Sequence, residues 1–418
     1  MSDFSTVPAE AKVLDQKYVM PTYGRLPVEF VRGAGAVLTD SAGNDYIDFL
    51  GGIGCASLGH AHPKVAAALK EQVDKVWQVG NYYYVENRGE LANGLSTLLS
   101  RITDETGHET GSTGTHWKTF FTNSGAEANE GAIKLARRWG EVNLDGAYGV
   151  VSAKKSFHGR TLATLAATGQ DVFHKTFRPM PLGFDSVELN DIDALRSAVE
   201  NPSEQCGPVC AVMLECVQGE GGVWPADYDY LCAVRELCDE YGFMLIIDEV
   251  QTGFYRCGAP FCFQRSGIVP DIVSMAKGIA DGFPMGAFAA RAEVADLLRP
   301  GDHGSTFGGN ALAVAAARAT VDALRDEEIG EHVIAVGKHL RHRLQVMDHV
   351  TEVRGRGLLR GAQLDVPVAN ELVDEGLACG LVLNHIGDSI IRFLPPLVIT
   401  REQIDEGMDR FEALLAKH

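Results

Sequence analysis

The stretch from Phe243 to Glu249 constrains the fold more than any other part of this sequence. Its apolar run, FMLII, ends abruptly in two acids, Asp248 and Glu249. A continuous apolar run of this length is typical of a strand buried on both faces, as in the parallel sheets of α/β proteins. Ligands of such sheets bind beyond the carboxyl ends of the strands, which is where we expect Asp248.

A second apolar segment, Ile272–Ala276, ends at Lys277 and is followed by a glycine-containing loop. One strand end therefore carries a carboxylate and another carries an amine. Each residue taken alone is also consistent with an ordinary solvated side chain where a strand meets a loop. A chemical role depends on which other residues converge on the same place.

Composition excludes several classes of protein. The net charge of −19 and the pI near 5.1 argue against binding to nucleic acids or to anionic membranes. The nine cysteines include no Cys-x-x-Cys pair, so neither a zinc site nor a disulfide framework is indicated. His60 and His62 have no evident third ligand, and we predict no metal site. No signal peptide or bilayer-spanning run of ~18 apolar residues is visible, which favours a cytoplasmic location.

Strand and helix signals alternate along the middle of the chain, through Trp117–Phe121, Gly149–Ser152 and Cys210–Leu214. This alternation predicts an α/β fold with a doubly wound, mostly parallel sheet. We expect an N-terminal arm and part of a small domain in residues 1–57, a large domain in residues 58–309, and a smaller α+β domain in residues 310–418. The polar segment Thr103–His116 is predicted to be a long surface loop.

The sequence TNSGAEANEG places the start of a helix directly after a strand. Ser124 and Glu127 are spaced as a capping box, which explains the pattern structurally. Small residues at Ser124, Gly125 and Ala126 would also leave the first N–H groups of the helix accessible. Such a helix start binds phosphate through free donors and the helix dipole.

The polar groups at the predicted strand ends fit one ligand, pyridoxal 5′-phosphate (PLP). The helix start would take the phosphate, Phe157 would stack on the ring, and Asp248 would pair with the protonated ring nitrogen. Lys277 would bond to the aldehyde, as PLP enzymes require. The acidic partner keeps the ring nitrogen protonated, so that the ring can accept electrons.

The sequence resembles the class III, fold-type I, PLP-dependent aminotransferases, and among them the acetylornithine aminotransferases. The resemblance runs from PTYGR at Pro21 to Thr400, and it is carried by FFTNSGAEANEGAIKLAR, SFHGRTLATLAATG, VQGEGGV, IIDEVQTG, PDIVSMAKG and HGSTFGGN. It implies an amino-group transferase of arginine and amino-acid biosynthesis that acts as a homodimer with shared active sites.

The resemblance also implies roles for individual residues. Lys277 would hold the cofactor covalently and carry the proton, and Gln251 would lie near the ring hydroxyl. Thr306 would reach the phosphate of the neighbouring subunit, and Tyr23 would close the substrate pocket. Arg160 would bind the distal carboxylate of glutamate or the α-carboxylate of the donor. Arg392 would bind the α-carboxylate of glutamate, and Glu220 would neutralise Arg392 when the donor is bound.

Substrate choice depends on fewer residues. Ile53 is aliphatic where enzymes for free ornithine tend to carry an aromatic side chain, which favours an acylated donor such as N-acetylornithine with 2-oxoglutarate as acceptor. Succinyldiaminopimelate, succinylornithine, ornithine and 4-aminobutyrate stay open as alternative donors. Departures from the family pattern at Cys216, Tyr255, Cys257 and Ala280-Asp281 leave the loops beside the cofactor less predictable.

Three other functions are alternatives to transamination. An aminomutase of the same fold would not need the combination of Arg160, Glu220 and Arg392. A nucleotide-binding ATPase would need a G-x-x-x-x-G-K-[ST] loop, which the sequence lacks. A non-catalytic PLP- or metabolite-binding protein is the alternative from outside the enzymes.

Overall fold

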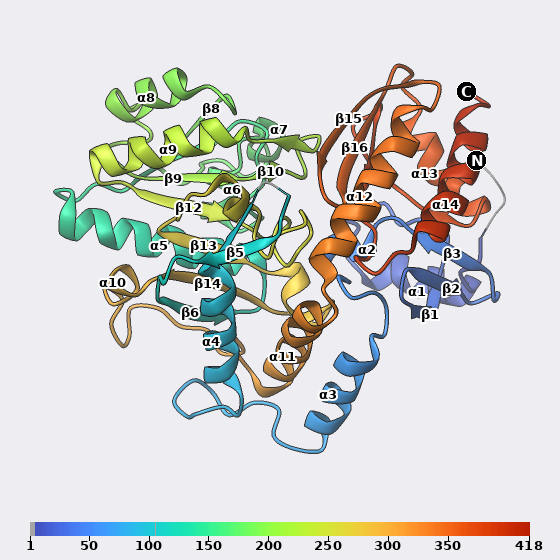
Figure 1. Cartoon of the computed structure of the whole chain (residues 1–418), viewed down its shortest axis with the longest axis horizontal. Helices are drawn as coiled ribbons and strands as arrows, with labels where there is room; N and C mark the ends of the chain where they lie inside the picture. The colour runs from blue at the N-terminus through green and yellow to red at the C-terminus, as the bar shows by residue number, and fades with distance from the viewer. Residues whose placement is uncertain (1–4, 105) are drawn as a thin grey trace.

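A seven-stranded sheet forms the centre of the larger lobe in the computed structural model, which describes residues 5–104 and 106–418 (Figure 1). Six strands run in one direction and β14 runs in the opposite one. The prediction of a mostly parallel α/β sheet is therefore confirmed. In spatial order the strands are β6 (Trp117–Thr122), β14 (Gly286–Arg291), β13 (Ile272–Met275), β12 (Met244–Asp248), β9 (Val209–Glu215), β7 (Gly149–Ala153) and β8 (Phe184–Val187).

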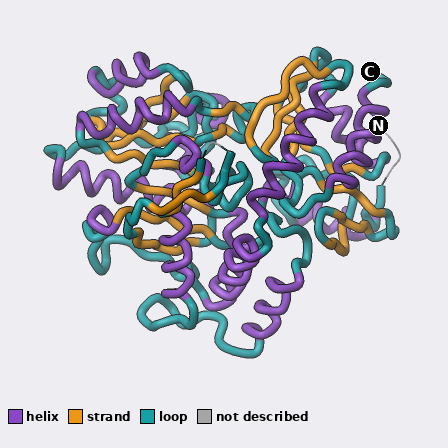
Figure 2. The backbone as a smooth tube through the Cα atoms, viewed as in Figure 1, coloured by secondary structure: helices purple, strands orange, loops and turns teal. Residues whose placement is uncertain are grey.

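Both faces of this sheet are buried, which explains the continuous apolar runs in its strands. Met244 and Ile246 of β12 pack into one apolar cluster, and Leu245 and Ile247 pack into another. Helices cover the two faces (Figure 2). The first cluster includes residues of α5 (Gly125–Asn143) and α6 (Leu162–Ala167), and the second includes residues of α8 (Ile192–Glu200) and α9 (Tyr228–Tyr241).

The smaller lobe contains two four-stranded sheets and lies on the right in Figure 1. One sheet joins β1 (Phe30–Ala34), β2 (Val37–Asp40) and β3 (Asp45–Asp48) to β17 (Leu381–Val382). The other consists of β15 (Val350–Arg356), β16 (Leu359–Leu364), β19 (Ile390–Phe393) and β18 (Asn384–Ile386). The parallel pairing of β3 with β17 brings two distant parts of the chain into one sheet. Helices α12 (Ile329–Gln345), α13 (Ala369–Ala378) and α14 (Arg401–Leu415) complete this lobe.

Helix α11 (Ala311–Asp326) packs against α3 (Pro63–Val73) and α4 (Arg88–Leu99). The domain limits at residues 57 and 309 stay a prediction. Pro63 occupies the first turn of α3, and Thr400 forms a capping box with Gln403 at the start of α14. Short elements complete the chain: α1 (Ala9–Tyr18), α2 (Gly51–Gly54), α7 (Asp171–His174), α10 (Ala292–Ala295), β10 (Val217–Gln218), β11 (Trp224–Pro225), η1 (Cys262–Ser266) and η2 (Lys277–Ala280).

The prediction of a continuous surface loop over Thr103–His116 is wrong. Strand β4 (Arg101–Thr103) pairs with β5 (Glu109–Ser112) in an antiparallel hairpin, and Glu105 lies outside the described residues. All four residues of β5 are exposed, so this strand carries no alternation of apolar and polar residues that would reveal it.

Within the described part of the chain, no helix is long and apolar enough to cross a membrane, and no group of three His, Cys, Asp or Glu residues is arranged to hold a metal ion. The nine cysteines are all free. His60 Nε2 lies at hydrogen-bond distance from Asp48 Oδ2, 2.7 Å away.

Candidate active site

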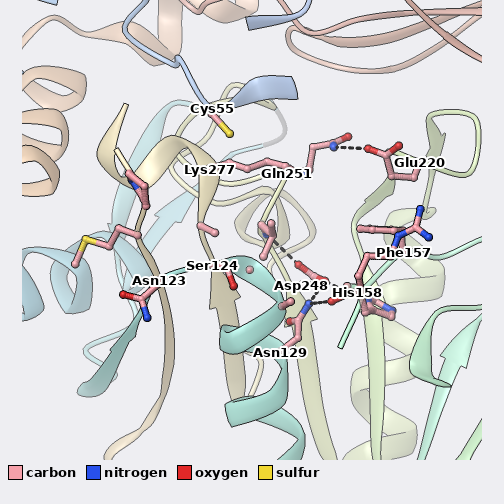
Figure 3. Close-up of a pocket in the computed structure, with 18 of the residues that line it drawn as sticks. Cys55, Asn123, Ser124, Asn129, Phe157, His158, Glu220, Asp248, Gln251 and Lys277 are labelled. Carbon is pink, nitrogen blue, oxygen red and sulfur yellow. Dashed lines mark hydrogen bonds and ion pairs between the residues drawn. The ribbon is translucent and has the colours of Figure 1, made fainter. Parts of the chain in front are cut away.

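A cavity opens where the carboxyl ends of β9, β12 and β13 meet the start of α5 (Figure 3). The parallel strands bring these ends to one edge of the sheet. Most of the predicted site residues line this one cavity: Ser124, Gly125, Ala126, Phe157, Arg160, Glu220, Asp248, Gln251 and Lys277.

Asp248 is the last residue of β12, and its carboxylate is held by donors from three segments. Asn129 Nδ2 of α5 and His158 Nδ1 each lie 2.8 Å from Asp248 Oδ2, and the N–H of Val250 donates to Oδ1 at 3.0 Å. Asn129 also donates to the backbone oxygen of His158 at 2.7 Å. Burial opposes protonation of His158, but the hydrogen bond to Asp248 and the charges of Asp248 and Glu215 together outweigh it and raise the histidine pKa.

The first turn of α5 forms the wall near Ser124. Ser124 Oγ accepts the N–H of Glu127 at 3.2 Å, so half of the predicted capping box is present. The other half is wrong, because the Glu127 carboxylate accepts the N–H of Asn123 at 2.7 Å instead of that of Ser124. Gly125 and Ala126 are the first residues of the helix, so their N–H groups have no carbonyl partner within it. They supply donors at a helix start, where the dipole favours an anion.

Lys277 follows β13 with a φ of +46°, a left-handed conformation that is uncommon for a residue with a side chain. This conformation begins the short helix η2 and turns the chain at the cavity. Burial lowers the pKa of the Lys277 amine, and the carboxylate of Glu220 only partly opposes this effect. The neutral amine, which is the nucleophilic and proton-accepting form, is therefore favoured relative to an exposed lysine.

Arg160 is exposed at the cavity and stacks on aromatic rings. Its guanidinium carbon lies 3.9 Å from the ring centre of Phe173 and 5.5 Å from that of Phe157. The rings orient the guanidinium and leave its N–H groups available for a carboxylate.

Glu220 and Arg392 form the ion pair that the sequence predicts. Arg392 Nη1 lies 2.6 Å from Glu220 Oε1 and also donates to the oxygen of Gly219 at 3.1 Å. Gln251 Nε2 donates to the same Glu220 oxygen at 3.2 Å. Burial opposes ionisation of Glu220, but Arg392, together with Lys277 and Gln251, outweighs it and lowers the glutamate pKa. Arg392 itself is buried behind Glu220 and does not line the cavity.

Besides Arg392, three predicted site residues lie outside this cavity. Tyr23 is 76% exposed and lines a groove of the N-terminal arm. Ile53 is 44% exposed, and Cys55 of the same segment reaches the cavity instead, above Lys277 in Figure 3. Thr306 is exposed, and its backbone oxygen accepts a hydrogen bond from Gln78.

Sequence reasoning missed the polar residues that surround Asp248. Asn129 is a buried amide on the otherwise apolar face of α5, beside Ala128 and Ala132, and that polar break was a usable signal. His158 and Glu215 carry no such signal, because His158 binds Asp248 and Glu215 binds the N–H of Phe157, and each partner is remote in sequence. Burial raises the pKa of Glu215 to about 7, with His158 acting against this and Asp248 adding to it.

Comparison with known proteins identifies the family. The family model of the class-III aminotransferases matches residues 18–415. An acetylornithine aminotransferase of Caldanaerobacter subterraneus is 43% identical over 408 residues, covering 96% of this chain and 98% of the relative. One from Methanothermobacter thermautotrophicus is also 43% identical, over 95% of this chain and 96% of the relative. The chain belongs to the class-III aminotransferases, which are PLP-dependent transferases of fold type I.

Solved structures agree with this assignment. An ornithine aminotransferase of Toxoplasma gondii, described with partial occupancy of PLP at its active site, matches with a TM-score of 0.88 at 31% identity, over 97% of this chain and 93% of that one. An N-acetylornithine aminotransferase of Stenotrophomonas maltophilia matches with a TM-score of 0.78 at 34% identity, over 97% and 98% of the two chains.

The residues of the cavity fit PLP chemically. A helix start suits the phosphate, Phe157 offers an aromatic face, and Asp248 offers a buried carboxylate for a cationic ring nitrogen. Lys277 supplies the amine that such enzymes require. Gln251 Oε1 is buried without a hydrogen-bond partner, so it is free to accept one from a ring hydroxyl.

Glu249, next to Asp248, generates a stability prediction. It is fully buried and accepts the N–H of Phe263 at 2.8 Å, and burial raises its pKa from 4.5 to about 8. Between these two pH values the folded protein keeps a proton that the unfolded chain releases. The free energy of unfolding therefore falls as pH rises through this window. Glu249→Gln removes the ionisable group, so its stability relative to the native protein should increase with pH, by at most about 1.4 kcal/mol per unit.

Urea unfolding of both proteins at the same concentration, from about pH 5.5 to about pH 8.5, measures this difference. The other titrating groups are the same in both proteins, so their contributions cancel in the difference between the two free energies of unfolding. A stability difference that does not change with pH would contradict the assignment of a raised pKa to Glu249.

Proposed function

We propose that this protein transfers the terminal amino group of N-acetylornithine to 2-oxoglutarate, giving N-acetylglutamate semialdehyde and glutamate in arginine biosynthesis. The observation that carries the proposal is the Arg392–Glu220 ion pair at the wall of a cavity that also presents Arg160. Such a site suits two kinds of substrate. A dicarboxylate would use both arginines, and a donor with one carboxylate would use Arg160 alone. The names and identities of the acetylornithine aminotransferase relatives support the same substrates.

Bound PLP would supply an aldehyde for the amino group and an electron-accepting ring. Lys277 would hold the cofactor covalently and would move a proton at the reacting carbon, a role that its lowered pKa favours. Asp248 would hold the proton on the ring nitrogen, while Asn129 and His158 keep the carboxylate in place. Phe157 would stack on the ring, Gln251 would bind its hydroxyl, and Ser124, Gly125 and Ala126 would bind its phosphate.

The two arginines divide the recognition of substrates. Arg160 binds the α-carboxylate of the donor or the distal carboxylate of glutamate, and Arg392 binds the α-carboxylate of glutamate. Planar guanidinium groups suit both tasks, because they bind carboxylates with two parallel hydrogen bonds. When the donor is bound, Arg392 has no carboxylate to bind, and Glu220 neutralises it. An unpaired buried arginine would otherwise oppose donor binding.

The homodimer belongs to the proposal as well. Gln78 and Asn81 donate to the backbone of Thr306 and Ser305, so two exposed loops lie together. Their surface is aromatic, since Tyr82, Tyr84 and Phe307 are 99%, 102% and 60% exposed. An aromatic surface of this kind suits a protein partner. A second copy would cover it, and Thr306 would bind the phosphate in the neighbouring active site.

The N-terminal arm and the donor pocket complete the proposal. Helix α1 has no buried residue, so the arm has freedom to bring Tyr23 over a bound substrate. Ile53 and Cys55 favour an acylated donor because neither offers an aromatic face to a free α-amine. We place the enzyme in the cytoplasm, with a large PLP-binding domain over residues 58–309.

A panel of amino donors tests the substrate assignment. With 2-oxoglutarate as acceptor, N-acetylornithine should give the highest kcat/KM, at least about tenfold above ornithine and 4-aminobutyrate, a difference of about 1.4 kcal/mol in transition-state binding. N-succinylornithine and succinyldiaminopimelate are the acylated comparisons. A higher kcat/KM for ornithine or 4-aminobutyrate would overturn the assignment.

Replacement of Lys277 tests its catalytic role. Lys277→Ala should lower kcat by at least about 10³-fold, because it removes the group that transfers the proton. Borohydride treatment should leave no cofactor mass on the protein. Lys338→Ala, at an exposed lysine, is the control and should keep both activity and the trapped cofactor. Borohydride trapping in the Lys277 variant would refute the assignment.

Replacement of Glu220 tests the charge switch. Glu220→Gln should leave Arg392 without its partner and lower kcat/KM for N-acetylornithine, while kcat/KM for glutamate stays the same or rises. We expect the ratio of the two values to change by about tenfold or more. Glu188→Gln breaks a surface ion pair with Lys154 and should leave the ratio unchanged. Equal losses for both substrates would show that Glu220 does not discriminate between them.

A further inference from the structure

Glu215 is a cavity carboxylate to which the proposed reaction gives no task. It is the last residue of β9, only 6% exposed, and lies in register with Asp248 on the neighbouring parallel strand. It lines the cavity together with Asp248. A second carboxyl group beside Asp248 is electrostatically unfavourable. We therefore expect Glu215 to have a function that offsets this cost.

The two oxygens of Glu215 bind two different loops. Oε1 accepts the N–H of Phe157 at 2.9 Å, and Oε2 accepts the N–H of Gly219 at 3.3 Å. The first loop carries Phe157 and Arg160, and the second carries Glu220. Glu215 is therefore the side chain that joins the loop of one recognition arginine to the loop that contacts the other.

The junction is closely packed. Gln218 of the second loop donates to the backbone oxygen of Lys154 in the first at 2.8 Å. At Gly221, a Cβ atom would lie only 2.4 Å from the backbone oxygen of Lys155. Gly219 also accepts a hydrogen bond from Arg392 through its own carbonyl. A shift of Gly219 would therefore change the position of the Arg392 guanidinium relative to that of Arg160.

We propose that Glu215 is a positioning residue that sets the spacing between Arg160 and Arg392 and thereby selects a dicarboxylate of the length of glutamate or 2-oxoglutarate. The inference rests on the proposed function of the two arginines. Glutamate needs both guanidinium groups at once, so its binding depends on their separation. The acylated donor needs Arg160 alone, and its binding depends on that separation far less.

A carboxamide cannot replace the carboxylate here. An ionised carboxylate accepts at both oxygens, whereas a glutamine side chain has one oxygen and one NH₂ group, which would face a backbone N–H. Glu215→Gln therefore keeps the size of the side chain and breaks one of the two loop contacts. Because its pKa is about 7, with His158 and Asp248 facing it, kinetics at about pH 8.5 compare the ionised carboxylate with the amide.

The test compares two Michaelis constants and backbone hydrogen exchange. In Glu215→Gln the KM for glutamate and for 2-oxoglutarate should rise about tenfold or more, while the KM for N-acetylornithine changes less than about threefold. Amide exchange should accelerate in residues 153–160 and 216–222, in the cofactor-free protein as well as in the holoenzyme. If Glu215→Gln does not fold, Glu215→Asp, whose carboxylate is too short to reach both loops, is expected to give the same pattern.

Glu249→Gln is the matched control. Glu249 is also a buried glutamate at the end of a central strand, but it accepts the N–H of Phe263 and the hydroxyl of Thr252, outside both loops, and the second loop reaches it only through the Cys216 thiol at 3.8 Å. Its replacement should leave exchange in residues 153–160 and 217–222 unchanged. Equal rises in all KM values, unchanged KM values, or faster exchange throughout the chain would overturn the positioning role. Failure of the wild-type enzyme to use N-acetylornithine would instead refute the proposed donor, and the exchange result would still stand.

Discussion

The active site depends on the burial of one carboxylate, that of Asp248. This side chain is only 3% exposed, and a buried carboxylate is stable only where donors surround it. Its donors come from α5, from the loop after β7 and from the loop after β12 itself. The three segments must therefore meet correctly at the same place. The parallel sheet makes this possible, because it brings the carboxyl ends of β7, β9 and β12 to one edge.

In the proposed function, the recognition of substrates is adjustable. Lys277 and Asp248 are set by the ends of β13 and β12, and neither would need to move between substrates. Glu220 and Arg392 differ from them because their ion pair would have to open for a second carboxylate. Gln251 and Gly219 hold the pair from two sides. In the proposed function, this strongly acidic chain would bind anionic substrates through local cations, which its net charge of −19 does not reveal.

Much of this arrangement was readable from the sequence, for physical reasons. Strands buried on both faces need continuous apolar runs, and β9, β12 and β13 carry them. The Glu220–Arg392 contact was expected only from the resemblance to the class III aminotransferases, because its residues are far apart in the chain. By contrast, β5 was missed because a fully exposed strand carries no apolar pattern. Glu215 and His158 were missed because their partners are set by strand order, which a single sequence does not display.

The sequence also did not reveal which loop side chains reach the cavity and which stay exposed. Ile53 was expected in the pocket, but Gly52 and Ile53 both have positive φ values, and this turn directs Cys55 to the cavity. Tyr23 and Thr306 are exposed in the single chain, so their proposed roles depend on arm closure and on the second subunit. These are the positions where local pattern is weakest and long-range geometry decides.

The most direct measurement of the central claim follows one nitrogen atom. The purified PLP-loaded enzyme is mixed with N-acetylornithine that carries ¹⁵N in its terminal amino group, first without any acceptor. One semialdehyde should form per subunit, and later addition of 2-oxoglutarate should place the ¹⁵N in the amino group of glutamate. If no product forms until the acceptor is present, or if the label is released as ammonia, then Lys277 and Asp248 do not support transamination as described.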